Sequence, residues 1–404
     1  MALRYGLLVC WMLLASAPAS AQVPAVGGDA TLDVATWNVE WFGAANGPTD
    51  DDLQRANVAD VILESGIDLW ALQEMADAED FEDLLDALGD GWAGVLATIS
   101  SQQRVGFVYR TDVFANVVVR HILTEFEEPF ATRPPLELTA NAVLPDTTLR
   151  LSFITVHMKA FSDQASYNKR AEAAQRLKNH LDFLRAGEPI VVLGDFNDRL
   201  TGSIRSGQPS PYAAFVADST DYRFLTLPLE RAGQGTFCGS NPACDDGAFI
   251  DHILITDELA PAYLAGSATR FDALLDAFDG TGGACGGEFV CTTSDHLPVL
   301  ARFRFGQPTS TGGPEAVPER LAVTTYPNPF QQHTTVAVTL PRAAHLRVEV
   351  YDLLGRRVET LADAPRPAGT HRLPFDAESL PPGLYLVRTA VGTEVHVQRV
   401  MLVR

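Results

Sequence analysis

After its first 21 residues, the chain contains no apolar stretch long enough to cross a membrane as a helix, which takes about 20 residues. The earlier apolar run, from Gly6 to Ala15, is also too short. It follows Arg4 and precedes the small residues Ala19-Ser20-Ala21, a pattern typical of a secretory signal peptide. We therefore expect residues 1–21 to direct export and then to be removed.

Cysteine is also scarce, with five in the chain, and removal of the signal would remove Cys10. The other four form two closely spaced pairs, Cys238 with Cys244 and Cys285 with Cys291, in CGSNPAC and CGGEFVC. An even number of cysteines in an exported protein indicates disulfides. Local pairing is preferred among the three connectivities. A zinc site is the alternative, but this spacing and an oxidising compartment both disfavour it.

Positively charged residues are few. The net charge is −21, and only three lysines occur: Lys159, Lys169 and Lys178. Residues 22–321 carry 20 Lys+Arg against 44 Asp+Glu, whereas residues from 322 onward carry 9 Arg against 7 Asp+Glu. So acidic a surface repels polyanions at low salt and disfavours tight, electrostatically steered binding of nucleic acid. High salt would screen the repulsion, and a salty habitat is one hypothesis for the acidity.

The length of 404 residues predicts two folded domains. Strand-like and helix-like patterns alternate only in part up to residue 305, which favours a four-layered α/β sandwich of two mixed sheets flanked by helices. Residues 306–321 are rich in Pro, Gly, Ser and Thr and are expected to form a linker. Beyond it, residues 322–404 contain short alternating runs separated by turn residues, which predicts a small Ig-like β-sandwich.

Polar side chains stand at the ends of six otherwise apolar strands. Each alone is more simply explained as a solvated acid or a locally bonded histidine. Together they supply oxygen ligands for Mg²⁺, a carboxylate to ready a water molecule, and imidazoles to stabilise charge on a phosphate. They are Asn38, Glu74, His157, Asp195 with Asn197, Asp251, and the pair Asp295-His296.

The motifs that carry these residues resemble those of the endonuclease/exonuclease/phosphatase superfamily, which includes DNase I, and they occur in the family's order. They are TWNVEWF, LQE, VGFVYR, TRPPL, VHMKA, LGDFND, IDHIL and SDHLPV, and they extend over about residues 31–305. The resemblance implies a metal site at Asn38, Glu74 and Asp295, with Glu74 as a direct ligand. Mg²⁺ is the expected ion, with Mn²⁺ or Ca²⁺ as alternatives.

The same resemblance implies the roles of the remaining polar residues. His157 corresponds to the histidine that hydrogen-bonds the scissile phosphate. Asp195 corresponds to the residue that positions or deprotonates the attacking water, with Asn197 as its phosphate-binding neighbour. His296 corresponds to a second catalytic histidine, oriented by Asp251.

Arg133 stands where DNase-like members place an arginine that contacts phosphate. Lys159 shares the strand face of His157 and is a candidate substrate contact, with an ordinary exposed lysine as the equal alternative. Gln103 is the nearest candidate for the glutamate that DNase I-like enzymes place behind the first histidine. Glu40 occupies the face where a minor-groove arginine would follow Asn38, which argues against binding of duplex DNA.

Several other residues are expected to be structural. Trp37, Trp41 and Trp70 alternate with polar residues and are predicted to lie in the core. Arg170 lies inside a predicted helix and is expected to form a structural ion pair. His252 follows Asp251, so strand alternation sends it to the opposite face.

The C-terminal region has a resemblance of its own. YPNPF at 326–330, DLLGRRV at 352–358 and PPGLYLVR at 381–388 resemble the C-terminal sorting domain of type IX secretion substrates. That resemblance implies recognition by an outer-membrane secretion machinery in a Gram-negative bacterium. A generic β-module for binding carbohydrate or protein is the alternative.

These patterns predict a monomeric enzyme, secreted or attached to the cell surface, that hydrolyses phosphodiester bonds with a divalent metal. A nuclease acting on extracellular nucleic acid is the preferred hypothesis. The alternatives are a phospholipase C or sphingomyelinase-like activity, a phosphomonoesterase, and a non-catalytic surface-binding module.

Overall fold

The computed structural model describes residues 23–305 and 321–403, apart from short gaps. The predicted signal peptide and nearly all of the predicted linker lie outside the described residues. The internal gaps are residues 29, 49, 100–101, 146, 240–243, 245–246, 279–287, 327, 331, 354, 368, 378–379 and 393.

The first six-stranded sheet has the strand order β11-β12-β1-β2-β4-β3. Strands β1 and β2 run parallel and their neighbours pair antiparallel, so the sheet is mixed. Its strands are β1 (Leu32–Phe42), β2 (Leu69–Met75), β3 (Trp92–Leu96), β4 (Arg104–Arg110), β11 (Thr269–Arg270) and β12 (Val299–Phe303).

The second six-stranded sheet has the order β5-β6-β7-β8-β10-β9 and is mixed in the same way, because only β7 and β8 run parallel. Its strands are β5 (Phe114–His121), β6 (Leu136–Leu144), β7 (Thr147–His157), β8 (Ile190–Asp195), β9 (Tyr222–Phe224) and β10 (Asp251–Thr256).

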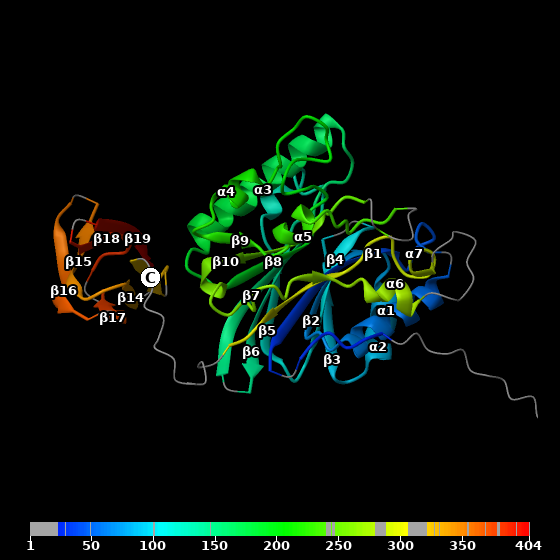
Figure 1. Cartoon of the computed structure of the whole chain (residues 1–404), viewed down its shortest axis with the longest axis horizontal. Helices are drawn as coiled ribbons and strands as arrows, with labels where there is room; N and C mark the ends of the chain where they lie inside the picture. Colours follow the sequence, from blue (N-terminus) through cyan, green and yellow to red (C-terminus); the bar gives the residue numbers. More distant parts are fainter. Residues whose placement is uncertain are drawn as a thin grey trace, which may run out of the picture.

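The two sheets pack face to face around a shared apolar core, and helices cover their outer faces (Figure 1). In β1, Val34 faces the other sheet while Ala35 faces the helices, as the two-residue period of a strand requires. Helices α1 (Asp51–Ser65) and α2 (Ala78–Leu88) cover the first sheet, and α3 (Gln164–Leu184) covers the second. The predicted four-layered arrangement is therefore confirmed.

Local sequence explains where the long helices begin. The side chain of Asp50 accepts a hydrogen bond from the Leu53 amide at the start of α1, and Asp77 and Asp163 cap α2 and α3 in the same way. The shorter helices lie mainly in loops between strands. They are η1 (Thr124–Phe126), α4 (Ala213–Ala217), α5 (Leu227–Arg231), η2 (Asp257–Leu259), α6 (Ala273–Ala277) and α7 (Glu288–Thr292).

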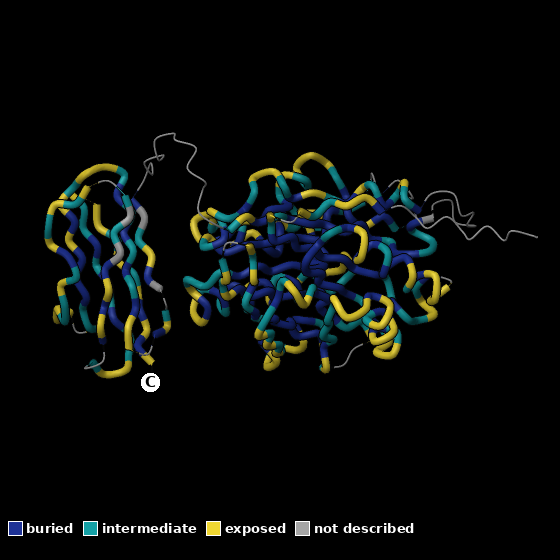
Figure 2. The backbone as a smooth tube through the Cα atoms, turned by 90° about the horizontal axis from the view of Figure 1, so that it is seen from below, coloured by how far each residue is buried: buried dark blue, intermediate teal, exposed yellow. Residues whose placement is uncertain are grey.

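The C-terminal region forms two antiparallel sheets around a separate apolar core (Figure 2). The antiparallel β architecture agrees with the sequence, while the Ig-like topology stays a prediction. None of the described helices is both long and apolar enough to cross a membrane. The strands are β13 (Ala322–Tyr326), β14 (His333–Leu340), β15 (Ala344–Asp352), β16 (Arg357–Arg366), β17 (Gly369–Asp376), β18 (Gly383–Val391) and β19 (Glu394–Leu402).

Candidate active site

Strand pairing places three of the predicted residues in one row across the second sheet. Asp195, at the end of β8, pairs with His157 of β7 on one side and with Asp251 of β10 on the other. Gly194 allows this close approach, because a Cβ atom there would lie 2.0 Å from the carbonyl oxygen of Val156. Close packing of β8 on β7 therefore requires glycine at position 194. The next residue, Asp195, ends β8 at the edge of the sheet.

Asn38 links the two sheets at this edge. Its Nδ2 donates to Glu74 Oε1 at 3.2 Å and to Asp195 Oδ2 at 3.0 Å. Asn38 and Glu74 belong to the first sheet and Asp195 to the second. The sequence prediction that these strand ends meet is therefore realised in the structure.

Asp195 is also held from the loop that follows β8. The amide N–H of Asn197 donates to Asp195 Oδ1 at 2.8 Å, and its Nδ2 donates to Oδ2 at 2.9 Å. Asn197 adopts a positive φ of 52°, a strained conformation that brings both groups back onto the carboxylate. Burial and the nearby Asp251 raise the pKa of Asp195 to about 7.

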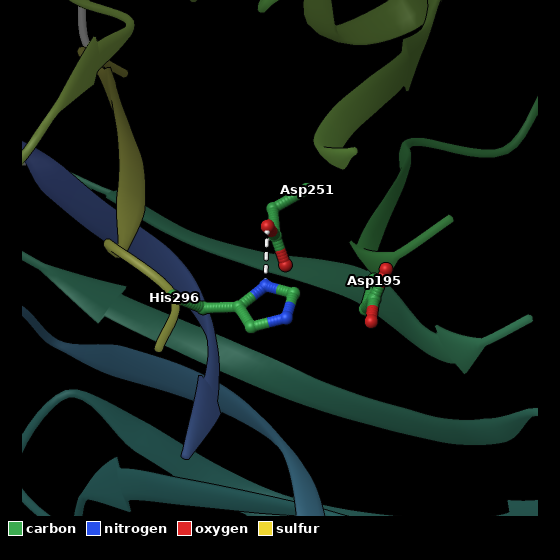
Figure 3. A group of neighbouring side chains, drawn as sticks. All are labelled: Asp195, Asp251 and His296. Atoms are coloured by element: carbon green, nitrogen blue, oxygen red, sulfur yellow. Dashed lines mark hydrogen bonds and ion pairs between the residues drawn. The ribbon is translucent and has the colours of Figure 1, made fainter. Parts of the chain in front are cut away.

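His296 and Asp251 form a buried pair, with Asp195 beside them (Figure 3). His296 Nδ1 lies 2.9 Å from Asp251 Oδ2. Burial alone would lower the pKa of His296, but the charges of Asp251, Asp295 and Asp195 raise it well above its usual range. Ligand atoms of Asp195, Asp251 and His296 lie within 4.8 Å of one another, so the three residues form one candidate metal group.

His157 has the opposite electrostatic character. Its Nε2 lies 3.6 Å from both Glu74 Oε1 and Asp195 Oδ2. Burial, followed by the positive charges of Arg133 and His296, lowers the pKa of His157 well below its usual range. The site therefore holds one neutral and one cationic imidazole, which suits them to different tasks.

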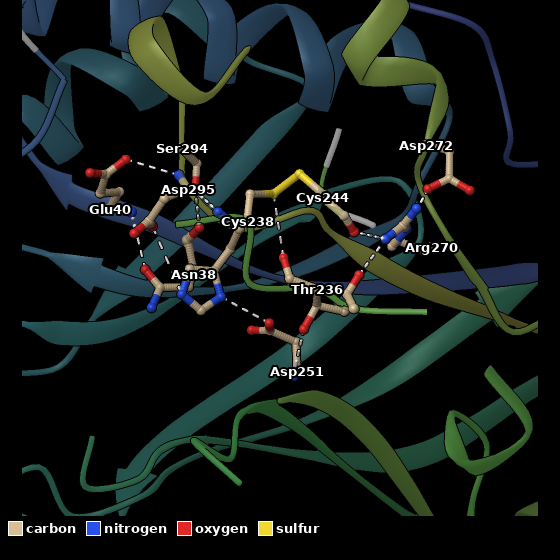
Figure 4. Close-up of a disulfide and its surroundings, with 12 residues drawn as sticks. Asn38, Glu40, Thr236, Cys238, Cys244, Asp251, Arg270, Asp272, Ser294 and Asp295 are labelled. Atoms are coloured by element: carbon tan, nitrogen blue, oxygen red, sulfur yellow. Dashed lines mark hydrogen bonds and ion pairs between the residues drawn. A yellow bond between two sulfur atoms is a disulfide. The ribbon is translucent and has the colours of Figure 1, made fainter. Parts of the chain in front are cut away.

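A second acidic group includes a residue that the sequence prediction missed. Glu40 lies beside Asp295, whose backbone N–H donates to Glu40 Oε2 at 2.9 Å (Figure 4). Burial and the charge of Asp295, with a smaller contribution from Glu74, raise the pKa of Glu40 to about 8. The available signal was strand alternation, since Glu40 follows Asn38 by two residues.

Three buried or half-buried carboxylates thus face one another at Glu40, Glu74 and Asp295, and burial also raises the pKa of Asp295. Such crowding is relieved when a cation binds among the oxygens. In the alternative group, an ion would compete with the hydrogen bond between His296 and Asp251. The carboxylate group and Asn38 therefore fit a hard divalent cation better.

Arg133 lies beside the site and is fixed from two sides. Nη1 donates to Gln103 Oε1 and Nη2 donates to the Met158 carbonyl at 3.0 Å. Gln103 therefore supports Arg133, and within the described chain no group hydrogen-bonds Nδ1 of His157. A cavity of about 490 Å³ adjoins Arg133 and is lined also by Lys159 and Trp41.

The prediction that Trp41 lies in the core was wrong, whereas Trp37 and Trp70 are fully buried as expected. The pairing of β1 with β2 shifts between Asn38 and Phe42, and Trp41 has a positive φ of 50°. This bulge interrupts the alternation and turns Trp41 toward the cavity, while Phe42 enters the core.

Arg170 and His252 have the structural roles that were predicted for them. Arg170 is fully buried, and its Nε donates to Asp198 Oδ2 at 2.8 Å. His252 Nδ1 lies 2.9 Å from the Thr226 hydroxyl, and its Nε2 lies 3.1 Å from the Asp198 carbonyl. These contacts fix the loop after Asp195 and place neither Arg170 nor His252 on the Asp195 carboxylate.

A disulfide supports the segment that carries Asp295 and His296. Cys238 is bonded to Cys244, as local pairing predicted, and the Cys238 N–H donates to the Asp295 carbonyl at 2.7 Å (Figure 4). Phe237 precedes Cys238, and the centroid of its ring lies 5.1 Å from that of the His296 ring. Cys291 is also disulfide-bonded, while Cys285 lies outside the described residues.

The sequence profile described as "Endonuclease/Exonuclease/phosphatase family" matches residues 35–296, which is more than half of the chain. The chain belongs to this family. The endonuclease/exonuclease/phosphatase family comprises hydrolases of phosphate esters, and its enzymes typically use divalent metals. A second profile, for a secretion system C-terminal sorting domain, matches residues 324–403 and indicates export by the type IX system.

Comparison with solved structures finds similar chains at low sequence identity. An endonuclease/exonuclease/phosphatase from Beutenbergia cavernae is 17% identical, with a TM-score of 0.50, and the match covers 92% of this chain and 100% of the other. A mannosyl-6-phosphatase from Bacteroides thetaiotaomicron is 18% identical, with a TM-score of 0.46 and coverages of 68% and 100%. D. rerio TDP2, complexed with a single-strand DNA product, is 14% identical, with a TM-score of 0.49 and coverages of 69% and 100%. No curated protein matches the chain.

Proposed function

We propose that this family member is an exported, divalent-metal-dependent phosphodiester hydrolase that cleaves extracellular nucleic acid. The observation that carries the proposal is the convergence of both sheets on Asp195. Asn38 hydrogen-bonds Asp195 from one sheet, and Asp251 with its partner His296 lies beside it from the other side. Such a cluster combines metal ligands, a base and a charge-stabilising group within one small space.

Asn38, Glu74 and Asp295 are proposed to hold the metal, joined by Glu40. Their oxygens are the hard ligands that Mg²⁺ prefers, with Mn²⁺ or Ca²⁺ as alternatives. When bound, the ion supplies Lewis-acid stabilisation of charge on the phosphate. The protein holds the carboxylates in place through the contacts of Asn38 with Glu74 and of Glu40 with Asp295.

The remaining residues act on the water and the phosphate. Asp195 accepts a proton as the water oxygen attacks phosphorus, and Asn197 holds the Asp195 carboxylate and contacts the phosphate. His296, oriented through Nδ1 by Asp251, presents Nε2–H to the developing charge. His157 stays neutral and hydrogen-bonds a phosphate oxygen. The bond from phosphorus to the leaving oxygen breaks in line, the leaving oxygen takes up a proton from solvent, and no covalent enzyme intermediate forms.

Arg133 and Lys159 are proposed to bind the substrate. Both line the cavity next to the site, in a protein whose net charge is −21. Their positive charge there attracts phosphate locally although the whole surface is acidic. This local excess of cations is the observation that favours nucleic acid over a neutral or lipid substrate.

A substrate panel tests the proposal. Single-stranded and duplex DNA, RNA, sphingomyelin and sugar or inositol phosphates are incubated with the purified protein and Mg²⁺, and with EDTA as a control. We expect Mg²⁺-dependent release of products from nucleic acid. Turnover of only the lipid or only the phosphomonoesters would replace the proposal with one of those activities. Failure to cleave any substrate would favour a non-catalytic surface module.

The domain organisation completes the proposal. Residues 1–21 act as the signal, 22–305 form the catalytic domain, 306–321 form the linker, and 322–404 form the sorting domain. The secretion machinery recognises the last of these, and the catalytic domain acts as a monomer outside the cell or at its surface.

The Cys238–Cys244 disulfide is expected to support catalysis. Replacing both cysteines by serine removes the constraint on the loop that holds Asp295 and packs on His296. We expect kcat to fall by about 10-fold, because small displacements of reacting groups are costly. The assay is run well below the melting temperature of the variant. A kcat equal to that of the wild type would show that the loop needs no covalent constraint.

A further inference from the structure

The cavity beside the candidate active site has a composition unlike the rest of the protein. Two of the three lysines in the whole chain, Lys159 and Lys169, line it together with Arg133. Burial, followed by the positive charges of Arg133 and Lys169, lowers the pKa of Lys159. Glu127 and Glu128 also line the cavity, and Lys169 forms an ion pair with Glu128 at 2.8 Å. The cations outnumber the acids here, in a chain that is acidic overall.

An aromatic side chain completes the lining. Trp41 is half-buried and faces the cavity because the bulge in β1 diverts it from the core. Indole rings stack on nucleic-acid bases with little regard to base identity. A tryptophan beside clustered cations therefore combines the two features with which proteins bind single nucleic-acid strands.

Strained backbone lines the same cavity. Ala131 and Thr132 have φ values of 54° and 64°, and Trp41 has a φ of 50°. A positive φ is a true outlier for a β-branched residue such as threonine. Strained conformations persist where surrounding structure enforces them, and they gather at ligand sites. The surrounding structure therefore holds the rim of the cavity in a defined conformation, as is common at ligand sites.

We propose that this cavity is a nucleotide subsite. It holds one unpaired nucleotide next to the scissile phosphate, with the base against Trp41 and the adjoining phosphate on Lys159 and Lys169. The volume of about 490 Å³ suits a ligand of this size. A base inside a duplex is stacked on both faces and cannot reach Trp41, so the enzyme prefers single strands. This inference rests on the proposed function and adds the substrate class.

The test compares two substrates. A single-stranded oligonucleotide offers a base and a second phosphate, whereas bis(p-nitrophenyl) phosphate offers one phosphate and no base. The measured quantity is the ratio of kcat/KM for the oligonucleotide to kcat/KM for the small ester. We expect Lys169→Gln and Trp41→Leu each to lower this ratio by roughly 10-fold, mainly through KM for the oligonucleotide.

Arg176→Gln is the matched control. Arg176 lies two turns beyond Lys169 on the same face of α3 and does not line the cavity, so the variant loses the same charge outside the subsite. Its ratio should equal that of the wild type. Lys169 is partly exposed, so Lys169→Gln should fold even where Trp41→Leu does not.

Three outcomes would overturn the inference. The first is an unchanged ratio in Lys169→Gln, and the second is an equal loss in Arg176→Gln, which would indicate general electrostatic attraction. The third is wild-type cleavage of duplex as fast as of single strands. In each case nucleic acid is still cleaved, so the proposed function stands. Wild-type turnover of the small ester with no cleavage of any nucleic acid would reject the proposed function itself.

Discussion

Replacing Asp195 by asparagine is expected to lower kcat for phosphodiester hydrolysis by at least about 100-fold. The amide keeps the shape of the side chain but cannot accept a proton from water. Asp195 is 1% exposed and accepts hydrogen bonds from Asn38 and Asn197, so asparagine fits the same space but turns its amide N–H2 toward at least one of these donors.

The stability of this variant distinguishes catalysis from structure. Burial and Asp251 raise the pKa of Asp195 to about 7, which means that the ionised carboxylate is costly in the folded protein. Relief of this cost opposes the loss of hydrogen bonds from Asn38 and Asn197, so Asp195→Asn should melt within a few degrees of the wild type at pH 8 while activity is lost. Asp86→Asn, an exposed change on α2, is the control and should alter neither quantity. Near-normal hydrolysis in Asp195→Asn would remove Asp195 from the mechanism.

Removing divalent metal is expected to reduce hydrolysis by at least about 100-fold, and added Mg²⁺ should restore it. The expectation follows from the crowding of Glu40, Glu74 and Asp295, whose charges oppose one another without a cation. Activity is measured in EDTA and then across a titration of Mg²⁺. Full activity in EDTA would contradict the assignment of these residues as a metal site.

Glu74→Gln links the metal effect to this site. Loss of a direct ligand should raise the Mg²⁺ concentration for half-maximal activity by at least about 10-fold. Glu79→Gln removes a charge from an exposed residue in the first turn of α2 and should leave the Mg²⁺ titration unchanged. Equal Mg²⁺ titrations for Glu74→Gln and the wild type would show that the metal binds elsewhere. Asp195, Asp251 and His296 would then be the next group to test.

Much of the fold could be predicted because apolar alternation is a strong local signal. Val34 and Ala35 face opposite layers of the sandwich, as their places in the strand require. The meeting of Asn38, Glu74 and Asp195 could also be predicted, since each lies near or at the end of a buried strand and in a motif of the family. The sequence could not give the pairing of His157 and Asp251 on either side of Asp195, which depends on the strand order of the second sheet.

The sequence predictions failed where the backbone departs from regular strand alternation or where a side chain bonds a different partner. Trp41 was expected in the core because alternation extends to it from Trp37, but a bulge with positive φ values at Glu40 and Trp41 intervenes. Gln103 was compared with a glutamate behind His157, yet it binds Arg133 instead. No local sequence pattern predicts a bulge, or which of two nearby partners a side chain will bond, because packing between the sheets decides both.

The most direct measurement is the rate at which single-stranded DNA is cleaved by the wild type and by Asp195→Asn, at equal folded concentration and saturating Mg²⁺. The convergence of both sheets on Asp195 predicts cleavage by the wild type and a rate at least about 100-fold lower in the variant. Equal rates in the two proteins would contradict the role of Asp195. Failure of the wild type to cleave either DNA or RNA would contradict the proposed activity.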